Sequence, residues 1–166
     1  MKKKLFAPLL MLSIAIFSCQ KSNVKAEDPS AKQSELKNDN DESNGGGPNV
    51  LNMVIKLSGD NEVPAVTTPT KGLAHLRVST SKKLYSKVIV QKVEPGDALR
   101  FSHVHAGAAG TNGPVRIFLC HTPDDFGKNI VTDLTDEQYD LLVNGAAYVN
   151  AHSNFYPPGI VRGQIR

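Results

Sequence analysis

The sequence predicts an all-β domain, an antiparallel sandwich or small barrel with one short helix in a connection. Apolar and polar residues alternate with a period of two over several short segments, and Gly, Pro and Asn residues separate these segments. Only one stretch has the spacing of an amphipathic helix. With 166 residues, of which 40% are hydrophobic, the chain has the length of one ordinary domain.

Seven strands are predicted along the chain. The first has apolar residues at every second position, namely Leu51, Met53, Ile55 and Leu57. In the second, Ala74, Leu76 and Val78 alternate with polar residues. Five further segments have the length and composition of strands, over residues 84–93, 98–106, 115–120, 146–152 and 160–165. Strands in such close succession indicate antiparallel connections and not βαβ units.

The single predicted helix begins after Thr135, whose hydroxyl is a good helix cap. Gln138, three residues later, completes a capping box. An apolar stripe at helical spacing follows, made of Tyr139, Leu142 and Val143. The Asn144-Gly145 pair is expected to end the helix.

Two stretches between predicted strands have no regular pattern, residues 60–70 and residues 107–114. The second, GAAGTNGP, is glycine-rich, as phosphate-binding loops are. No helix pattern and no Lys-Ser or Lys-Thr pair follows it, so a nucleotide-binding loop is excluded. We expect Asn112 and Gly113 to form a tight turn that leads into the strand at Val115.

The N-terminal residues predict export and a lipid anchor. Residues 1–18 combine three lysines with a mostly apolar run that is too short to span a membrane comfortably, as in a signal peptide. Ser18 and Cys19 follow, and this junction resembles the bacterial lipobox, in which the cysteine is acylated and becomes the new N-terminus. Residues 19–48 begin with this lipidated Cys19 and continue as a polar, glycine-containing tether expected to be disordered.

The folded domain is therefore expected over residues 49–166. We expect a protein of the bacterial cell envelope, anchored to the membrane through its N-terminal lipid. The outer membrane is the expected location, with the domain either in the periplasm or on the cell surface. Its partner would be an extracytoplasmic protein, glycan or small ligand.

Charge and cysteine content exclude several functions. The chain has 19 basic and 16 acidic residues, and three of the basic ones precede the expected processing site, which leaves a nearly neutral protein. A neutral protein lacks the electrostatic basis for binding nucleic acid. Two cysteines, Cys19 and Cys120, are too few for a disulfide framework or a Cys-rich zinc site. Cys120 ends the apolar run RIFLC, so we expect a small buried hydrophobe there.

Four blocks of the expected domain resemble the CHRD domain family, named after chordin: LSGDNEVPAV, KGLAHLRV, FSHVHAGAAGTNGPVRIFL and LLVNGAAYVNAHSNFYPPGIVRGQIR. The patterns HxHxGxxGxNGPV and YVNxHxxxxPxGxxRGQI are the most specific parts of this resemblance. It implies an immunoglobulin-like β-sandwich with limited similarity to copper–zinc superoxide dismutases. It implies no settled biochemical activity.

Three histidines are candidate metal ligands. His103 and His105 are two residues apart in one predicted strand, so both side chains project from the same face. His152 lies in another predicted strand, and the three rings converge if the two strands are neighbours. Imidazole nitrogens suit copper(II) and zinc. Alternatively, the histidines brace the glycine-rich loop through hydrogen bonds to backbone carbonyls and Asn side chains, which is the outcome we expect.

The remaining residues of the two specific patterns are expected to be structural. They are Gly107, Gly110, Asn112, Gly113, Pro114, Asn150, Gly159, Arg162 and Gly163. Arg162 could present its guanidinium to a ligand or pair with a carboxylate such as Glu62, and we expect the ion pair across the sheet.

Two functions are consistent with these observations. The first is a non-enzymatic cell-envelope lipoprotein that presents its domain as a binding or structural module, with no catalytic residue and no cofactor. The second is a copper or zinc protein with a superoxide-dismutase-like site at His103, His105 and His152. The sequence favours the first, because a tethered compact domain needs no chemistry and the set of metal ligands is incomplete.

Overall fold

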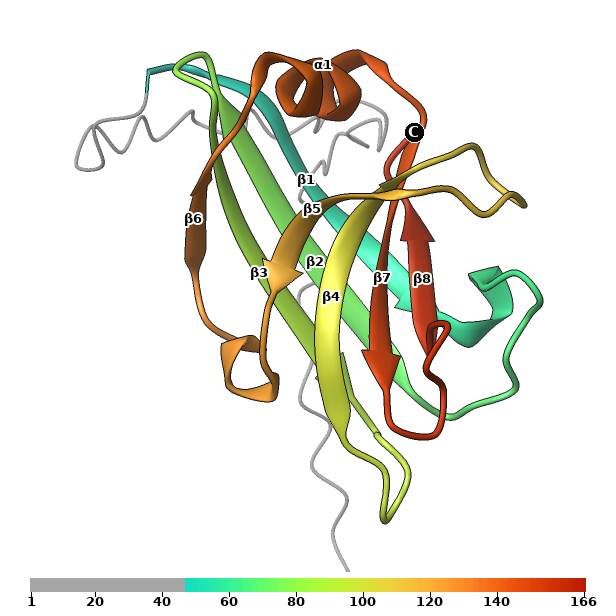
Figure 1. Ribbon diagram of the computed structural model, residues 1–166. Coiled ribbons are helices and arrows are strands. Elements are labelled where there is room, and N and C mark those ends of the chain that lie inside the picture. Colours follow the sequence, from blue (N-terminus) through green and yellow to red (C-terminus); the bar gives the residue numbers. More distant parts are fainter. Residues whose placement is uncertain (1–46) are drawn as a thin grey trace, which may run out of the picture. The chain divides into compact units, whose positions relative to one another are not determined.

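The computed structural model describes residues 47–166, and the expected signal segment, Cys19 and most of the expected tether lie outside the described residues. In this part the chain is all-β with one short helix, which confirms the predicted class (Figure 1). The strands are β1 Asn49–Ser58, β2 Lys71–Ser79, β3 Lys83–Gln91, β4 Leu99–Ala106, β5 Val115–Cys120, β6 Ile130–Asp133, β7 Ala147–Ser153 and β8 Val161–Gln164. The helices are α1 Asp136–Asn144 and two 3₁₀ turns, η2 Gly59–Asn61 and η3 Pro123–Asp125.

All eight strands belong to one antiparallel sheet, in the order β5-β4-β7-β8-β1-β2-β3-β6. The sheet curls until it is nearly closed, with β5 and β6 at its two edges (Figure 1). The sequence predicts either a sandwich or a small barrel, and the single curled sheet is closer to the barrel. Strand β6, which the sequence does not reveal, pairs with β3 and extends this edge.

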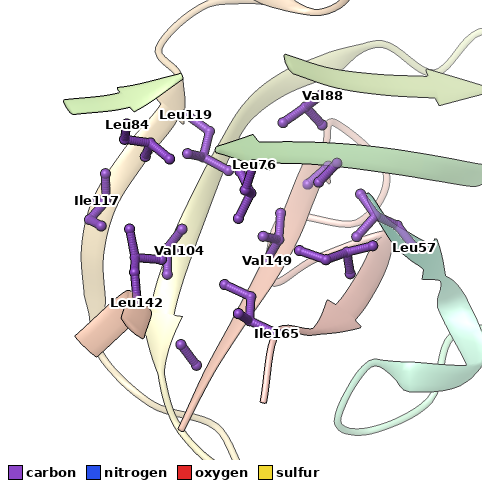
Figure 2. Packing of buried hydrophobic residues seen from close by; sticks show 14 of the residues in the cluster. Leu57, Leu76, Leu84, Val88, Val104, Ile117, Leu119, Leu142, Val149 and Ile165 are labelled. Atoms are coloured by element: carbon purple, nitrogen blue, oxygen red, sulfur yellow. The ribbon is translucent and has the colours of Figure 1, made fainter. Parts of the chain in front are cut away.

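The core fills the inside of the curled sheet with the apolar residues that alternate along each strand. Figure 2 shows Leu57, Leu76, Val104 and Val149 pointing toward one another from four different strands. Each of these side chains is at most 1% exposed. Burying a side chain of this size contributes about 1.5–3 kcal/mol, so the core is the main source of stability.

Helix α1 packs against one end of this core through Leu142, which is fully buried. Its capping box forms as predicted, because the Thr135 hydroxyl accepts a hydrogen bond from the Gln138 backbone and the Gln138 side chain accepts one from the Thr135 backbone. The Gln138 amide also donates to the backbone carbonyl of Arg116, which ties the helix to edge strand β5. The helix ends before Gly145, as expected.

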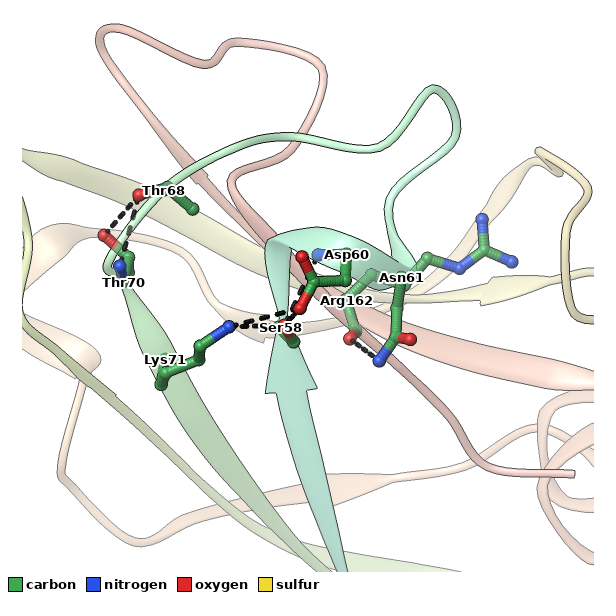
Figure 3. Close-up of polar contacts among 7 residues, drawn as sticks. All are labelled: Ser58, Asp60, Asn61, Thr68, Thr70, Lys71 and Arg162. Atoms are coloured by element: carbon green, nitrogen blue, oxygen red, sulfur yellow. Dashed lines mark hydrogen bonds and ion pairs between the residues drawn. The ribbon is translucent and has the colours of Figure 1, made fainter.

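The segment between β1 and β2 is fixed at both ends (Figure 3). Lys71 donates to the Ser58 hydroxyl and contacts the Asp60 carboxylate, which joins the end of β1 to the start of β2. The Asn61 amide donates to the backbone carbonyl of Arg162 at 3.0 Å, which attaches this segment to β8. We call residues 59–70 the first loop.

The glycine-rich segment, residues 107–114, is the second loop, and its turn lies earlier than predicted. The turn is formed by residues 108–111, where the backbone N–H of Thr111 donates to the carbonyl of Ala108 and Gly110 has a φ of 76°. The prediction of a turn at Asn112 and Gly113 is wrong. These two residues have no regular secondary structure, and the backbone N–H of Ala106 donates to the Pro114 carbonyl directly after them.

No helix among the described residues is long and apolar enough to cross a membrane.

Candidate metal centre

Strands β4 and β7 place three histidines on the sheet face opposite the core. His103 and His105 share this face because they are two residues apart, while Val104 between them points into the core. His103 pairs with Asn150 across the β4–β7 ladder, so His152 lies two residues farther along β7 on the same face. The neighbouring strands therefore bring together the three histidines that the sequence singles out.

The three imidazole rings are buried close to one another. Their centroids are 5.0 Å apart for His103 and His152, 5.5 Å for His103 and His105, and 6.4 Å for His105 and His152. One ligand nitrogen of each ring lies within 4.8 Å of those of the other two rings. The residues are only 5–8% exposed.

Backbone carbonyls fix the orientation of two of the rings. His105 Nδ1 lies 2.8 Å from the carbonyl oxygen of Gly113, and His152 Nδ1 lies 2.7 Å from that of Pro157. A carbonyl only accepts, so both Nδ1 atoms carry the hydrogen, and in the neutral ring Nε2 keeps a lone pair. His105 Nε2 and His103 Nδ1 are buried without a hydrogen-bond partner among the described residues.

Asn150 contacts the remaining ring nitrogen. Its amide oxygen Oδ1 lies 3.1 Å from Nε2 of His152, whose one hydrogen is already donated from Nδ1 to Pro157, and its NH₂ lies 3.4 Å from the Pro158 carbonyl. A neutral ring makes a favourable contact here only if the amide turns its NH₂ toward Nε2. A metal ion at this nitrogen would have to replace the Asn150 contact.

The surroundings favour neutral imidazoles. Burial, together with the positive charge that His152, His105 and His121 would contribute, lowers the pKa of His103 to about 4. Burial also lowers the pKa of His152, against the opposing effect of its hydrogen bond to Pro157. The neutral ring is the form that binds a metal ion, so these two residues would not have to lose a proton near neutral pH.

Three neutral imidazoles are a suitable donor set for copper(II) or zinc. Two nitrogens at about 2.0–2.1 Å from one zinc ion are at most about 4.2 Å apart, which is close to the limit of 4.8 Å within which the three ligand nitrogens already lie. Among residues 47–166 no other His, Cys, Asp or Glu residue joins this group. A bound ion would therefore keep a coordination position for a small ligand.

Two phenylalanine rings pack against the histidine group. Phe101 lies 4.9 Å from His103 and 4.7 Å from His152, and Phe118 meets His103 edge-on at 4.4 Å, measured between centroids. His121 stacks on Phe118 at the surface and does not join the three histidines.

Arg162 does not form the ion pair with Glu62 that the sequence predicts. No carboxylate of the described residues lies within 4.0 Å of its guanidinium, although the residue is only 1% exposed. Instead, the guanidinium lies 3.3 Å from the ring centroid of Tyr148 and donates to the Ala108 carbonyl and to Asn112 Oδ1. Its length lets it reach the second loop.

The second loop and the first loop are joined through Asn112, whose amide donates to the Val63 carbonyl at 2.8 Å. Gly113 is required where it lies, because a Cβ there would be 1.6 Å from the carbonyl oxygen of Ala106. Gly163 has the same role in β8, where a Cβ would be 2.4 Å from the Lys56 carbonyl oxygen. Asn112 therefore joins the two loops, and Gly113 and Gly163 allow the close approach of neighbouring backbone segments.

Glu62 is a buried polar residue whose environment the sequence does not reveal. It is 8% exposed, and its Oε1 is buried without a hydrogen-bond partner among the described residues. Burial raises the pKa of its carboxyl to about 7, although the charge of Arg162 acts in the opposite direction. The carboxyl lies against Gly159, far along the chain, where a Cβ would be 2.5 Å from Oε1.

Cys120 is buried and forms no disulfide within the described residues. Burial raises the pKa of its thiol to about 12, so it has no thiolate at neutral pH. This agrees with the small buried hydrophobe that the sequence predicts.

No curated protein and no solved structure matches the chain significantly. The family model described as CHRD domain matches residues 53–165, which is more than half of the chain and spans all the strands that carry the site. The order of the sequence blocks, the all-β sheet and this match agree, and the chain belongs to the CHRD domain family.

Proposed function

We propose that the folded domain is a binding module for one transition metal ion, copper(II) or zinc, held by His103, His105 and His152. The observation that carries this proposal is the convergence of three buried imidazoles, two of which donate their Nδ1 hydrogen to a backbone carbonyl. Histidines that ligate a metal nearly always donate their other ring hydrogen in this way, which fixes the tautomer and the orientation of the ring.

The module has no catalytic activity of its own in this proposal. Among the described residues, Cys120 holds its proton too tightly to act as a nucleophile, and no carboxylate orients any of the three histidines. The ion would serve as the ligand of the module or as a structural element.

The setting that we propose for this module is the bacterial cell envelope. The basic and apolar segment over residues 1–18, followed by Cys19, supports a lipid anchor, and the polar composition of residues 20–48 supports a tether. A tether of this length has a root-mean-square reach of about 30 Å, which is enough to hold the domain clear of the lipid headgroups.

Metal content tests the proposal directly. The purified protein is dialysed against copper(II) or zinc, freed of loose ions by gel filtration and analysed by mass spectrometry. We expect about one ion per chain, and loss of that ion in His103→Asn, His105→Asn and His152→Asn. His75→Asn is the matched control, because His75 is exposed on the outer side of β2. Equal metal content in all variants would contradict the proposal.

The second candidate is a purely structural role for the histidines, and the two carbonyl hydrogen bonds favour it as well. The two candidates differ in how a chelator changes the melting temperature of the unchanged protein: a metal site responds to it and a structural role does not. Removing a bound ion lowers the melting temperature, because an ion present at about 100 times its dissociation constant stabilises the fold by about 2.7 kcal/mol. A bracing pair loses about 1–3 kcal/mol on substitution, with or without a chelator.

A further inference from the structure

A pocket of about 320 Å³ opens beside the histidine group. Its walls come from the first loop, the second loop and the segment that follows β7, and they include Glu62, Val66, Asn112 and Gly159. His105, one of the three histidines, also lines this pocket, and so does Asn150, whose side chain contacts His152. The volume is about that of ten water molecules in the liquid, which suits a small molecule.

Two residues of the pocket wall have buried polar atoms without a partner. One is Oε1 of Glu62 and the other is Nε2 of His105, and both residues are more than nine-tenths buried. Buried polar groups in proteins are nearly always hydrogen-bonded, since leaving one unpaired costs about 1–3 kcal/mol. The proposed ion would be the partner of His105 Nε2, and a molecule in the pocket would meet the carboxyl group of Glu62, which lines it.

The charges around the pocket favour an anion. Arg162 is buried behind Asn112 and Tyr148, both of which line the pocket, and no described carboxylate lies within 4.0 Å of it. An ion on the histidines would add positive charge on the same side. The carboxyl group of Glu62 can donate a hydrogen bond to an anion while it holds its proton.

We infer that this pocket admits a small monoanion, of the size of a carboxylate such as formate or acetate, to the open coordination position of the ion held by His103, His105 and His152. One atom of the anion binds the ion, and another accepts a hydrogen bond from Glu62. The pocket is the route of entry in this proposal, since His105 and Asn150 line it. This inference rests on the proposed function.

Azide is the probe for the test, because it is a small monoanion whose bond to copper(II) gives an absorption band. The full-length protein is loaded with copper(II) and titrated with azide. We expect saturable binding, and we expect Val66→Trp, which fills the pocket, to weaken it at least tenfold with copper content unchanged. Val54→Trp is the matched control, since Val54 is 56% exposed on β1 and does not line this pocket.

Substitutions of Glu62 test the second contact and do not depend on the folding of the Val66 variant. Glu62→Gln keeps a hydrogen-bond donor and is expected to bind azide within about threefold of the unchanged protein, whereas Glu62→Leu is expected to lose about tenfold. Copper-loaded protein that binds no azide, or binds it equally well in all variants, would overturn this inference alone. A protein that binds no copper would overturn the proposed function and this inference with it.

Discussion

The guanidinium of Arg162 lies 3.3 Å from the ring centroid of Tyr148, and the imidazole of His105 stacks on the same Tyr148 ring at 4.8 Å with an interplanar angle of 7°. The Tyr148 hydroxyl also accepts a hydrogen bond from the backbone of Gly113 in the second loop. One side chain of β7 therefore joins the neighbouring strand β8, the histidine group and the glycine-rich loop. The HxHxGxxGxNGPV and YVNxHxxxxPxGxxRGQI patterns meet physically at this residue.

We expect a strong energetic coupling between Arg162 and Tyr148. A desolvated cation over an aromatic ring contributes about 2 kcal/mol, against about 0.5–1 kcal/mol at an exposed site. A double-mutant cycle with Arg162→Met and Tyr148→Leu, followed by urea unfolding, measures this term. The more exposed pair of Arg77 and Tyr85, with the guanidinium 4.0 Å from the ring centroid, is the comparison. Equal coupling in both cycles would contradict the expected effect of burial.

Gly159 and Gly110 form a matched pair for testing the contact between Gly159 and Glu62. Both have a positive φ, 148° and 76°, but a Cβ at Gly110 meets nothing within 4 Å, whereas one at Gly159 meets the Glu62 carboxyl. We expect Gly110→Ala to cost about 1 kcal/mol of unfolding free energy and Gly159→Ala about 2–4 kcal/mol. Chemical denaturation measures both. Adding Glu62→Ala to Gly159→Ala should recover part of the loss, and no recovery would mean that the carboxyl is not the obstacle.

The lipid anchor is tested by metabolic labelling with a radioactive fatty acid in a bacterial host. The unchanged protein should carry label, and Cys19→Ala should not, because acylation requires the thiol of the residue that follows Ser18. Cys120→Ala is the control, since Cys120 is buried in β5 and should leave the labelling unchanged. Label on the Cys19→Ala protein would place the lipid elsewhere.

Local patterns predict most of the strands and the helix because they depend on neighbours in sequence. Alternation identifies β1 and β2, and a capping box identifies α1. Strand β6 has only four residues, Ile130–Asp133, too few to show a period. The position of the turn in the second loop is also not fixed by its residue types. The hydrogen bond between Thr111 and Ala108 places this turn earlier than the Asn112-Gly113 pair indicates.

For the candidate site too, local patterns predict some features, and others depend on contacts between distant segments. The spacing of His103 and His105 places both on one face of β4, but their meeting with His152 depends on β4 and β7 being neighbours, which no local pattern shows. The burial of Glu62 depends on Gly159, a contact between segments far apart in the chain. Such long-range contacts are settled by the packing of the whole sheet.

The last prediction concerns the pH dependence of stability that Glu62 causes. The pKa of its carboxyl is about 7 in the folded protein, above the value of 4.5 expected when the chain is unfolded. Well below pH 4.5 the Glu62 carboxyl is protonated in both the folded and the unfolded state, so it does not make the unfolding free energy depend on pH. Between pH 4.5 and about 7 the unfolded chain releases this proton and the folded protein keeps it, so rising pH lowers the unfolding free energy, and above about pH 7 the loss is complete.

Glu62→Gln isolates this effect, because Gln has nearly the same shape and does not titrate. Urea titrations at about pH 4 and about pH 8 measure the unfolding free energies of both proteins. From the lower to the higher pH, the unfolding free energy of the variant should rise by about 3 kcal/mol relative to that of the unchanged protein. The histidines titrate in both proteins, so their contribution cancels in the difference, and a chelator in all samples removes any bound ion. A difference that stays constant with pH would show that the Glu62 carboxyl has an ordinary pKa in the folded protein, and its burial against Gly159 would then not be as the structure has it.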